Sequence, residues 1–221
     1  MHSIGIIGGT GPEGRGLATR FAIAGHKIII GSRNEKRGLD VATELSETLN
    51  KSFPDKLNIS GTNNLDTARE SDIAIITVPY DAHLETLSEL SPYLSDKIVI
   101  DAVVPVKFER GPRPIPVEAG SATEEAAKLL ENSFVIGAFH NLSAEKLLEP
   151  NLSLDSDVLI TGNSKDAKNI AINLANEIKG VRAIDAGPLR YSQFIENLTV
   201  LLIGINGRYK TETGLKISGI D

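Results

Sequence analysis

The stretch GIIGGTGPEGRGLATRFAIAGHKIIIGSRNEKRG, residues 5–38, decides the fold. Its apolar start leads into a glycine-rich turn and an amphipathic segment, and a second apolar run at 27–31 ends in Gly-Ser-Arg. Pro12 suits the first turn of a helix, because the N–H that it lacks has no partner there. The stretch therefore predicts a strand, a helix and a second strand parallel to the first.

The same alternation of apolar and amphipathic runs continues along the chain. Runs such as 28–30 and 73–76 are apolar without a period of two, as in parallel strands that helices cover on both faces. The expected strands are 4–8, 27–31, 73–78, 97–101, 133–138, 157–161 and 181–185. The expected helices are 12–24, 35–50, 82–91, 121–131, 143–148, 165–179 and 188–205. This order predicts an α/β fold, a doubly wound Rossmann-type parallel sheet with a small C-terminal α/β domain, divided into 1–145 and 146–221.

One segment, 102–120, breaks this rhythm. It contains Pro112, Pro114 and Pro116, which remove backbone donors and hold the residues before them extended. No helix or strand is expected there beyond the first few positions. A long segment of this kind in a compact domain is usually functional or disordered. Because it leaves the carboxyl end of an expected strand, an active-site loop is the favoured interpretation.

Composition limits the classes of partner and location. The net charge of −6 argues against a nucleic-acid partner, for which a basic face is expected. The chain has no cysteine, so thiol catalysis and thiolate metal sites are excluded. The apolar run 200–203 is far shorter than the roughly 20 residues that span a bilayer. Since the first strand starts almost at once, no export signal is expected, and the sequence predicts a cytoplasmic protein with no membrane partner.

The turn at 9–14, Gly-Thr-Gly-Pro-Glu-Gly, fits the pattern G-x-G-x-x-G. In that pattern the first glycine allows the tight turn, the second lets the backbone approach a pyrophosphate, and the third lets the helix pack closely. The free N–H groups at the start of the helix then favour bound phosphates. The alternative is a glycine-rich turn without a ligand. Its position between a strand and a helix favours dinucleotide binding.

The end of the second strand distinguishes the two common dinucleotides. An NAD site places an acidic residue there for the ribose 2′-hydroxyl. This chain has Ser32, Arg33 and Asn34 instead, followed by Lys36 and Arg37. A hydroxyl and a guanidinium suit a 2′-phosphate, because the planar fork of arginine binds phosphate oxygens well. The cations alone could form the solvated start of a helix, but that leaves the missing acid unexplained, so NADP(H) is the predicted cofactor.

Motifs along most of the chain resemble a known family, the coenzyme F420-dependent NADP oxidoreductases. They are GGTGPEGRGLA, GSR, TVPYDAH, VVPV, GAFH, DAGPL and TGLKI, within residues 3–217. The resemblance implies hydride transfer between NADP(H) and an 8-hydroxy-5-deazaflavin, coenzyme F420, in a cleft between a larger NADP domain and a small C-terminal domain. It also implies a homodimer. The chain departs from the family pattern at Pro12 and Glu13, where an Asn-Leu type pair is usual.

The resemblance also implies which residues bind the two cofactors. Those implied for NADP(H) are Gly9, Thr10, Gly11, Pro12 and Glu13 at the pyrophosphate, Ser32, Arg33 and Arg37 at the 2′-phosphate, and Val78, Pro79, Tyr80, Leu84, Val104, Val106 and Ala138 at the nicotinamide half. Those implied for the deazaflavin are His140, Leu142, Leu201 and Thr213.

No catalytic side chain and no metal site is predicted, because direct hydride transfer between two rings needs only their alignment and the exclusion of water. His140 follows an expected strand, where it could contact the second cofactor or make a structural hydrogen bond. With a pKa near neutrality, it could donate to an anionic deazaflavin oxygen.

Two other functions stay open. One is an NADPH-dependent reductase of an ordinary flavin or another small acceptor. The other is a non-catalytic NADP(H)-sensing protein. The GAFH and DAGPL segments favour an enzyme, since a sensor has no need for a second ring site.

Overall fold

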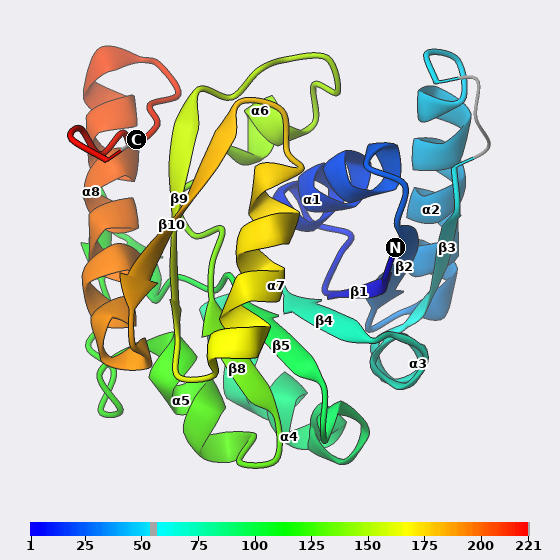
Figure 1. Ribbon diagram of the computed structural model, residues 1–221, viewed down its shortest axis with the longest axis horizontal. Helices are drawn as coiled ribbons and strands as arrows, with labels where there is room; N and C mark the ends of the chain where they lie inside the picture. The colour runs from blue at the N-terminus through cyan, green and yellow to red at the C-terminus, as the bar shows by residue number, and fades with distance from the viewer. Residues whose placement is uncertain (54–56, 221) are drawn as a thin grey trace.

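The computed structural model describes residues 1–53 and 57–220. Within these ranges, eight strands form one sheet in the order β10-β9-β8-β5-β4-β1-β2-β3, with helices on both faces (Figure 1). The strands are β1 (Ser3–Ile7), β2 (Lys27–Ser32), β3 (Ile59–Asn63), β4 (Ile73–Ile76), β5 (Ile98–Asp101), β8 (Phe134–Gly137), β9 (Ser156–Gly162) and β10 (Val181–Gly187). The helices are α1 (Pro12–Ile23), α2 (Glu35–Leu49), α3 (Asn64–Glu70), α4 (His83–Leu94), α5 (Ala122–Leu129), α6 (Ala144–Leu147), α7 (Lys165–Asn176) and α8 (Ser192–Tyr209).

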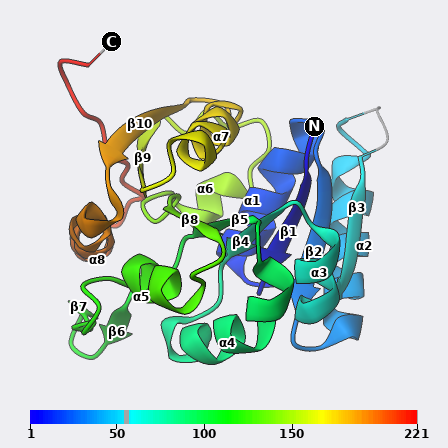
Figure 2. The same ribbon diagram turned by 60° about the horizontal axis from the view of Figure 1, so that its bottom comes forward.

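Successive strand residues supply two separate cores. In β1, Ile4 and Ile6 pack with the α1, α2 and α7 side chains, whereas Ile7 packs with those of α3, α4 and α5. In β4, Ile75 and Ile76 divide between the same two cores. Figure 2 shows α1 and α7 on one side of the sheet and α4 and α5 on the other. Both faces are therefore buried, which explains the apolar runs without alternation and confirms the doubly wound α/β prediction.

The sheet is mostly parallel rather than wholly parallel. β8 pairs with β9 in the antiparallel direction, at Ile136 with Gly162, while β9 and β10 are parallel to each other. The strands on either side of residue 145 thus belong to one continuous sheet. The division into domains 1–145 and 146–221 stays a prediction.

Three strands and a helix were not expected from the sequence. β3, an edge strand, and α3, a short helix, lie within 59–70. The polar run Ser-Gly-Thr-Asn-Asn at 60–64 lacks the apolar pattern by which a strand is predicted. At the β3 position 61, a Cβ would lie 2.1 Å from the carbonyl oxygen of Gly38 in α2. Helix and strand therefore meet backbone to backbone, and glycine at 61 is required by this close approach.

The expectation of a structureless segment at 102–120 is wrong in part. β6 (Val106–Phe108) and β7 (Pro112–Pro114) form an antiparallel hairpin, which packs beside α8 (Figure 2). In an antiparallel pair, every second residue of a strand makes the hydrogen bonds to its neighbour. Ile115 N donates to Pro105 O, so the hydrogen-bonded residues of β7 are those an even number of positions from Ile115. Pro112 and Pro114 fall on the positions between them, where the ladder needs no N–H. Proline therefore does not break this strand.

Candidate functional site

The glycine turn is held in the form that a dinucleotide site needs. Gly8 adopts φ +74°, and Gly9 N donates to Gly31 O at 2.9 Å, which ties the turn to the end of β2. A Cβ at Gly14 would lie 2.6 Å from the Gly9 Cα, so only glycine lets α1 begin against the turn. Gly11 caps α1 with no side-chain hydrogen bond. The first N–H groups of α1 are therefore available to an anion.

The first cavity, of about 490 Å³, opens beside this turn and extends to the end of β2. Ser32 is buried there, whereas Arg33 and Arg37 are exposed. Asn34 caps α2 by accepting from Arg37 N at 3.2 Å, which places Arg37 in the first turn of that helix. We call this hollow the phosphate cavity. It is lined by Gly8, Thr10, Gly11, Pro12, Glu13, Ser32, Arg33, Asn34, Arg37, Asn64, Thr77, Val78, Pro79, Ala82 and Thr86.

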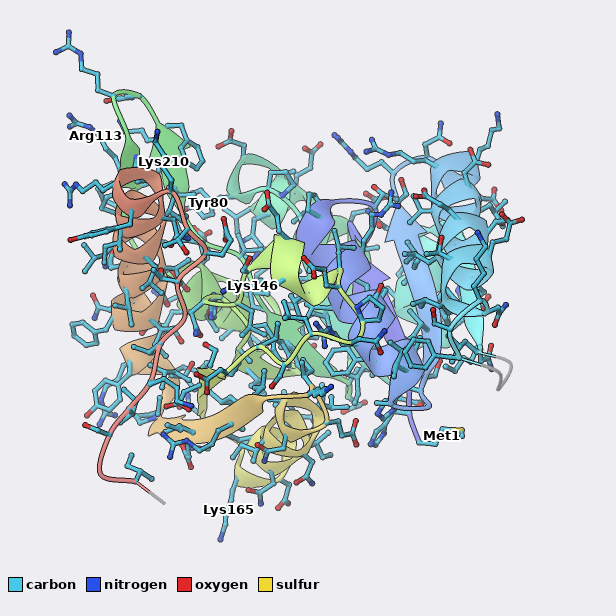
Figure 3. All side chains as sticks on the ribbon, turned by 90° about the horizontal axis from the view of Figure 1, so that it is seen from above. Met1, Tyr80, Arg113, Lys146, Lys165 and Lys210 are labelled. Carbon is cyan, nitrogen blue, oxygen red and sulfur yellow. The ribbon has the colours of Figure 1, made fainter. Side chains whose placement is uncertain are left out.

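A second cavity of about 460 Å³, which we call the cleft, lies at the carboxyl ends of β4, β5 and β8. Its far wall comes from α8 and the segment after it. Figure 3 shows Tyr80 and Lys146 between α8 and α1. The cleft is lined by Glu13, 77–80, 102–104, Val106, Phe108, 139–144, Thr199, Leu202, Ile203, Asn206, Glu212 and Thr213. Glu13 and Thr77–Pro79 line both cavities, so the two spaces adjoin.

The chain's last segment returns to complete the cleft. Asp157 N in β9 donates to Leu215 O at 2.7 Å, and Ser143 Oγ donates to a Glu212 carboxylate oxygen at 2.9 Å. Thr213 is fixed by its bonds to Asn206 Oδ1 of α8. These contacts place Glu212 and Thr213 on the cleft wall, although they lie more than sixty residues after the strand ends that form its floor.

His140 is buried in the cleft wall, and neither of its ring nitrogens finds a hydrogen-bond partner among the described residues. The preceding residue, Phe139, adopts φ +69°, a strained conformation that turns the chain at the end of β8. Burial lowers the pKa of His140 to about 4. The imidazole is therefore neutral at pH 7, and the expectation of a near-neutral pKa is wrong. A neutral ring still offers one N–H donor to a ligand.

Behind the cleft lies a buried ionisable pair that the sequence did not reveal. His83 Nε2 is 2.8 Å from Asp101 Oδ2, and both side chains are fully buried. Asp101 Oδ1 also accepts from Val103 N at 3.0 Å. Burial acts to lower the pKa of His83, but the Asp101 and Glu125 carboxylates outweigh it and raise that pKa. The pair thus fixes the start of the 102–106 segment that borders the cleft.

Most of the residues expected at the site line one cavity or the other. Leu84, Ala138 and Leu201 do not: Leu84 is 43% exposed, Ala138 is fully buried and Leu201 is 55% exposed. Gly9 lies within the turn rather than on a cavity wall. From α8 the lining residues are instead Thr199, Leu202, Ile203 and Asn206. Asn64 and Thr86 in the phosphate cavity were also missed: Asn64 begins α3, a helix that the sequence did not predict, and Thr86 lies near the start of α4, where no motif marks it.

Neither a metal cluster nor a membrane span is found in the part of the chain that the structure describes. No three His, Asp or Glu side chains there converge as metal ligands. No described helix is both long and apolar enough to cross a bilayer.

The Rossmann-type sheet, the glycine turn and the adjoining cleft together define an NADP-dependent oxidoreductase. Residues 3–105 match the family described as NADP oxidoreductase, coenzyme F420-dependent. The F420-dependent NADP reductase of Methanocaldococcus jannaschii is 40% identical over 222 residues, covering 99% of both chains. That of Methanothermobacter thermautotrophicus is 39% identical over 226 residues, covering 100% of this chain and 96% of its own. This chain belongs to the F420-dependent NADP reductase family.

A solved structure shows the same fold. The crystal structure of a candidate F420-dependent NADP reductase from Arthrobacter sp. FB24 superposes with a TM-score of 0.83 at 24% identity. The match covers 99% of this chain and 100% of that one.

Proposed function

We propose that this protein transfers a hydride between NADP(H) and coenzyme F420. The observation that carries the proposal is that the phosphate cavity and the cleft meet at a shared wall, Thr77–Pro79 and Glu13. A dinucleotide held at the glycine turn can then extend its nicotinamide end past this wall. A second ring in the cleft would lie against it. The family relationship supports the same pair of cofactors.

The phosphate cavity suits NADP(H) by its charge and its donors. The uncapped start of α1 favours the pyrophosphate. Buried Ser32 supplies a hydroxyl, and Arg33 and Arg37 supply guanidinium groups that a 2′-phosphate prefers. These residues, with Gly9 to Glu13, form the proposed binding site for the dinucleotide.

The cleft suits two stacked rings because its walls are mostly apolar and come from several elements. When bound, the two cofactors supply the hydride donor and acceptor carbons, and the protein's part is to align them at about 3–3.5 Å without water. We propose Val78, Pro79, Tyr80, Val104 and Val106 on the nicotinamide side. On the deazaflavin side we propose His140, Leu142 and Thr213. Roles for Leu84, Ala138 and Leu201 stay predictions, as they line neither cavity.

The direct test is anaerobic mixing of the protein with NADPH and coenzyme F420, followed by the visible absorbance of the oxidised deazaflavin. NADPH is expected to bleach that absorbance, and NADH much less. Parallel reactions with FMN and FAD test the ordinary-flavin alternative. NADPH binding with no bleaching of F420 would reject the deazaflavin, and no turnover with any of these acceptors would favour a sensor.

We also propose that the protein is a homodimer joined through α8. One side of this helix carries Phe194, 62% exposed, and Leu201, 55% exposed, with the partly exposed Leu198 and Ile205 between and after them. Their spacing of four, three and four residues forms a continuous apolar stripe. Such a stripe on the surface indicates an interface, and its self-complementary chemistry fits a second copy of the same helix.

The dimer proposal predicts that Phe194→Lys converts the protein to a monomer, because two copies of the lysine would face each other across an isologous contact. Molar mass from light scattering during size-exclusion chromatography measures this. Leu39→Lys is the matched control, since Leu39 is 48% exposed on α2, away from the stripe. A wild-type protein that elutes as a monomer contradicts the proposal.

A further inference from the structure

Glu13 occupies an unusual place for an acidic residue. It is the second residue of α1, next to the glycine turn, and it lines both the phosphate cavity and the cleft. Part of the residue stays exposed, but its Oε1 atom is buried and has no hydrogen-bond partner within residues 1–53 and 57–220. Because buried polar groups are almost always hydrogen-bonded, a bound ligand is expected to supply the missing hydrogen-bond partner of this oxygen.

A carboxylate at this position would oppose the bound dinucleotide. The N–H groups at the start of α1 attract the pyrophosphate, and Glu13 lies in that same first turn. Two like charges in a partly dry site repel strongly. Burial raises the pKa of Glu13 to about 8, so the side chain is a neutral acid at pH 7. In that form the carboxyl carries an O–H, which can donate to an anionic or hydroxyl oxygen.

We propose that Glu13 binds NADP(H) as a protonated carboxyl that donates a hydrogen bond to the dinucleotide, so that cofactor affinity is linked to one proton. This inference rests on the proposed function, because it requires NADP(H) at the glycine turn. It adds a role that the glycine pattern does not require, since that pattern places no acid at the position.

Two of the ionisable side chains that face Glu13 are neutral near pH 8. From the cleft side, Tyr80, His140 and Glu212 face the same space, and from the phosphate side Arg33 and Arg37 do. With a pKa of about 4, His140 stays neutral in this range. Burial and the Glu125 carboxylate raise the pKa of Tyr80, so the phenol also stays neutral.

Glu196 is another buried carboxyl with a raised pKa, but it lies away from Glu13's two cavities. Burial raises the pKa of Glu196 to about 7. Its oxygens accept from Ala122 N and Thr123 N at the start of α5, and it lines neither of the two cavities. Any effect of Glu196 would therefore begin below the pH range in which Glu13 ionises.

The linkage has a definite direction. The bound state holds the proton more tightly than the free protein, so affinity is full well below the free pKa and falls as pH rises through it. The Kd for NADPH is expected to stay constant between pH 6.5 and 7.5 and then to rise toward about tenfold per pH unit above pH 8. The 2′-phosphate itself ionises lower, at roughly pH 6, and does not contribute in this range.

The experiment is a titration of the full-length protein with NADPH at half-unit steps from pH 6.5 to 9.5, followed by fluorescence. Wild type is expected to show the rise, Glu13→Gln a flat profile, and Glu89→Gln the wild-type profile, because Glu89 is an exposed acid on α4. Calorimetry of wild type at pH 8.5, in two buffers of different ionisation enthalpy, should show uptake of a large fraction of one proton.

A flat wild-type profile, or no proton uptake by wild type, overturns the inference even if the glutamine variant fails to fold. A rise that persists in Glu13→Gln assigns the proton to another group and overturns it as well. In all these cases NADPH still binds at pH 7, so the proposed function is untouched. If NADPH fails to bind at any pH, the proposed function falls and takes the role of Glu13 with it.

Discussion

Replacing Arg33 and Arg37 together by alanine is expected to lower kcat/KM for NADPH by about 10²- to 10⁴-fold, because each removes charge-assisted hydrogen bonds worth roughly 1.5–3 kcal/mol. Both side chains line the phosphate cavity at the end of β2, beside the buried Ser32 hydroxyl. NADH lacks the 2′-phosphate and should be used about as well by the variant as by wild type. Steady-state rates with NADPH and NADH at fixed F420 concentration measure the change in preference.

Lys36→Ala is the matched control for this pair. Lys36 lies between the two arginines in sequence and is also exposed, but it does not line the phosphate cavity. Its loss changes the net charge of the same helix start and should leave kcat/KM for NADPH within a few-fold of wild type. Equal losses for Lys36→Ala and the double variant would mean that general attraction, rather than binding of the 2′-phosphate, sets the preference.

The parts of the site that depend on local sequence could be predicted, because contacts between residues close in sequence determine their conformation. The glycine turn needs its glycines for backbone contacts within a few residues, such as that between Gly14 and Gly9. Ser32 ends β2 and Arg33 follows it, and the apolar run of that strand indicates where it ends. The segments after β4, β5 and β8 meet in the cleft because the carboxyl ends of neighbouring parallel strands share one edge of the sheet.

The rest depends on contacts between distant segments. α8 is apolar on most of its sides between 198 and 205, so its sequence does not say that Leu202 and Ile203, rather than Leu201, face the cleft. The edge strand β3 has only Ile59 as a strong apolar residue, so no apolar run marks it in the sequence. The pKa values of Glu13 and His140 depend on burial by elements far along the chain, which no local pattern reports.

The buried imidazole of His140, which has no hydrogen-bond partner in the part of the chain that the structure describes, is expected to contribute strongly to kcat/KM for F420. His140→Phe is expected to lower kcat/KM for F420 by about 10- to 100-fold, because it removes the free N–H donor, and a lost hydrogen bond at a desolvated group costs roughly 1–3 kcal/mol. Phenylalanine retains a ring of similar size, so the cleft keeps its packing. The Kd for NADPH should change little. Kinetics with F420 and separate NADPH titrations distinguish the two effects.

His140→Gln is the companion variant, since its amide can restore an N–H donor and should recover much of the lost rate. The wild-type rate should also show no step from imidazole protonation between pH 5.5 and 8, because a group with a pKa of about 4 is already neutral throughout that range. Wild-type kinetics in His140→Phe would leave His140 a packing residue with no contact to F420. A rate step near pH 6.5 that disappears in His140→Gln would show instead that the imidazole ionises in the working enzyme, and that cofactor binding relieves its burial.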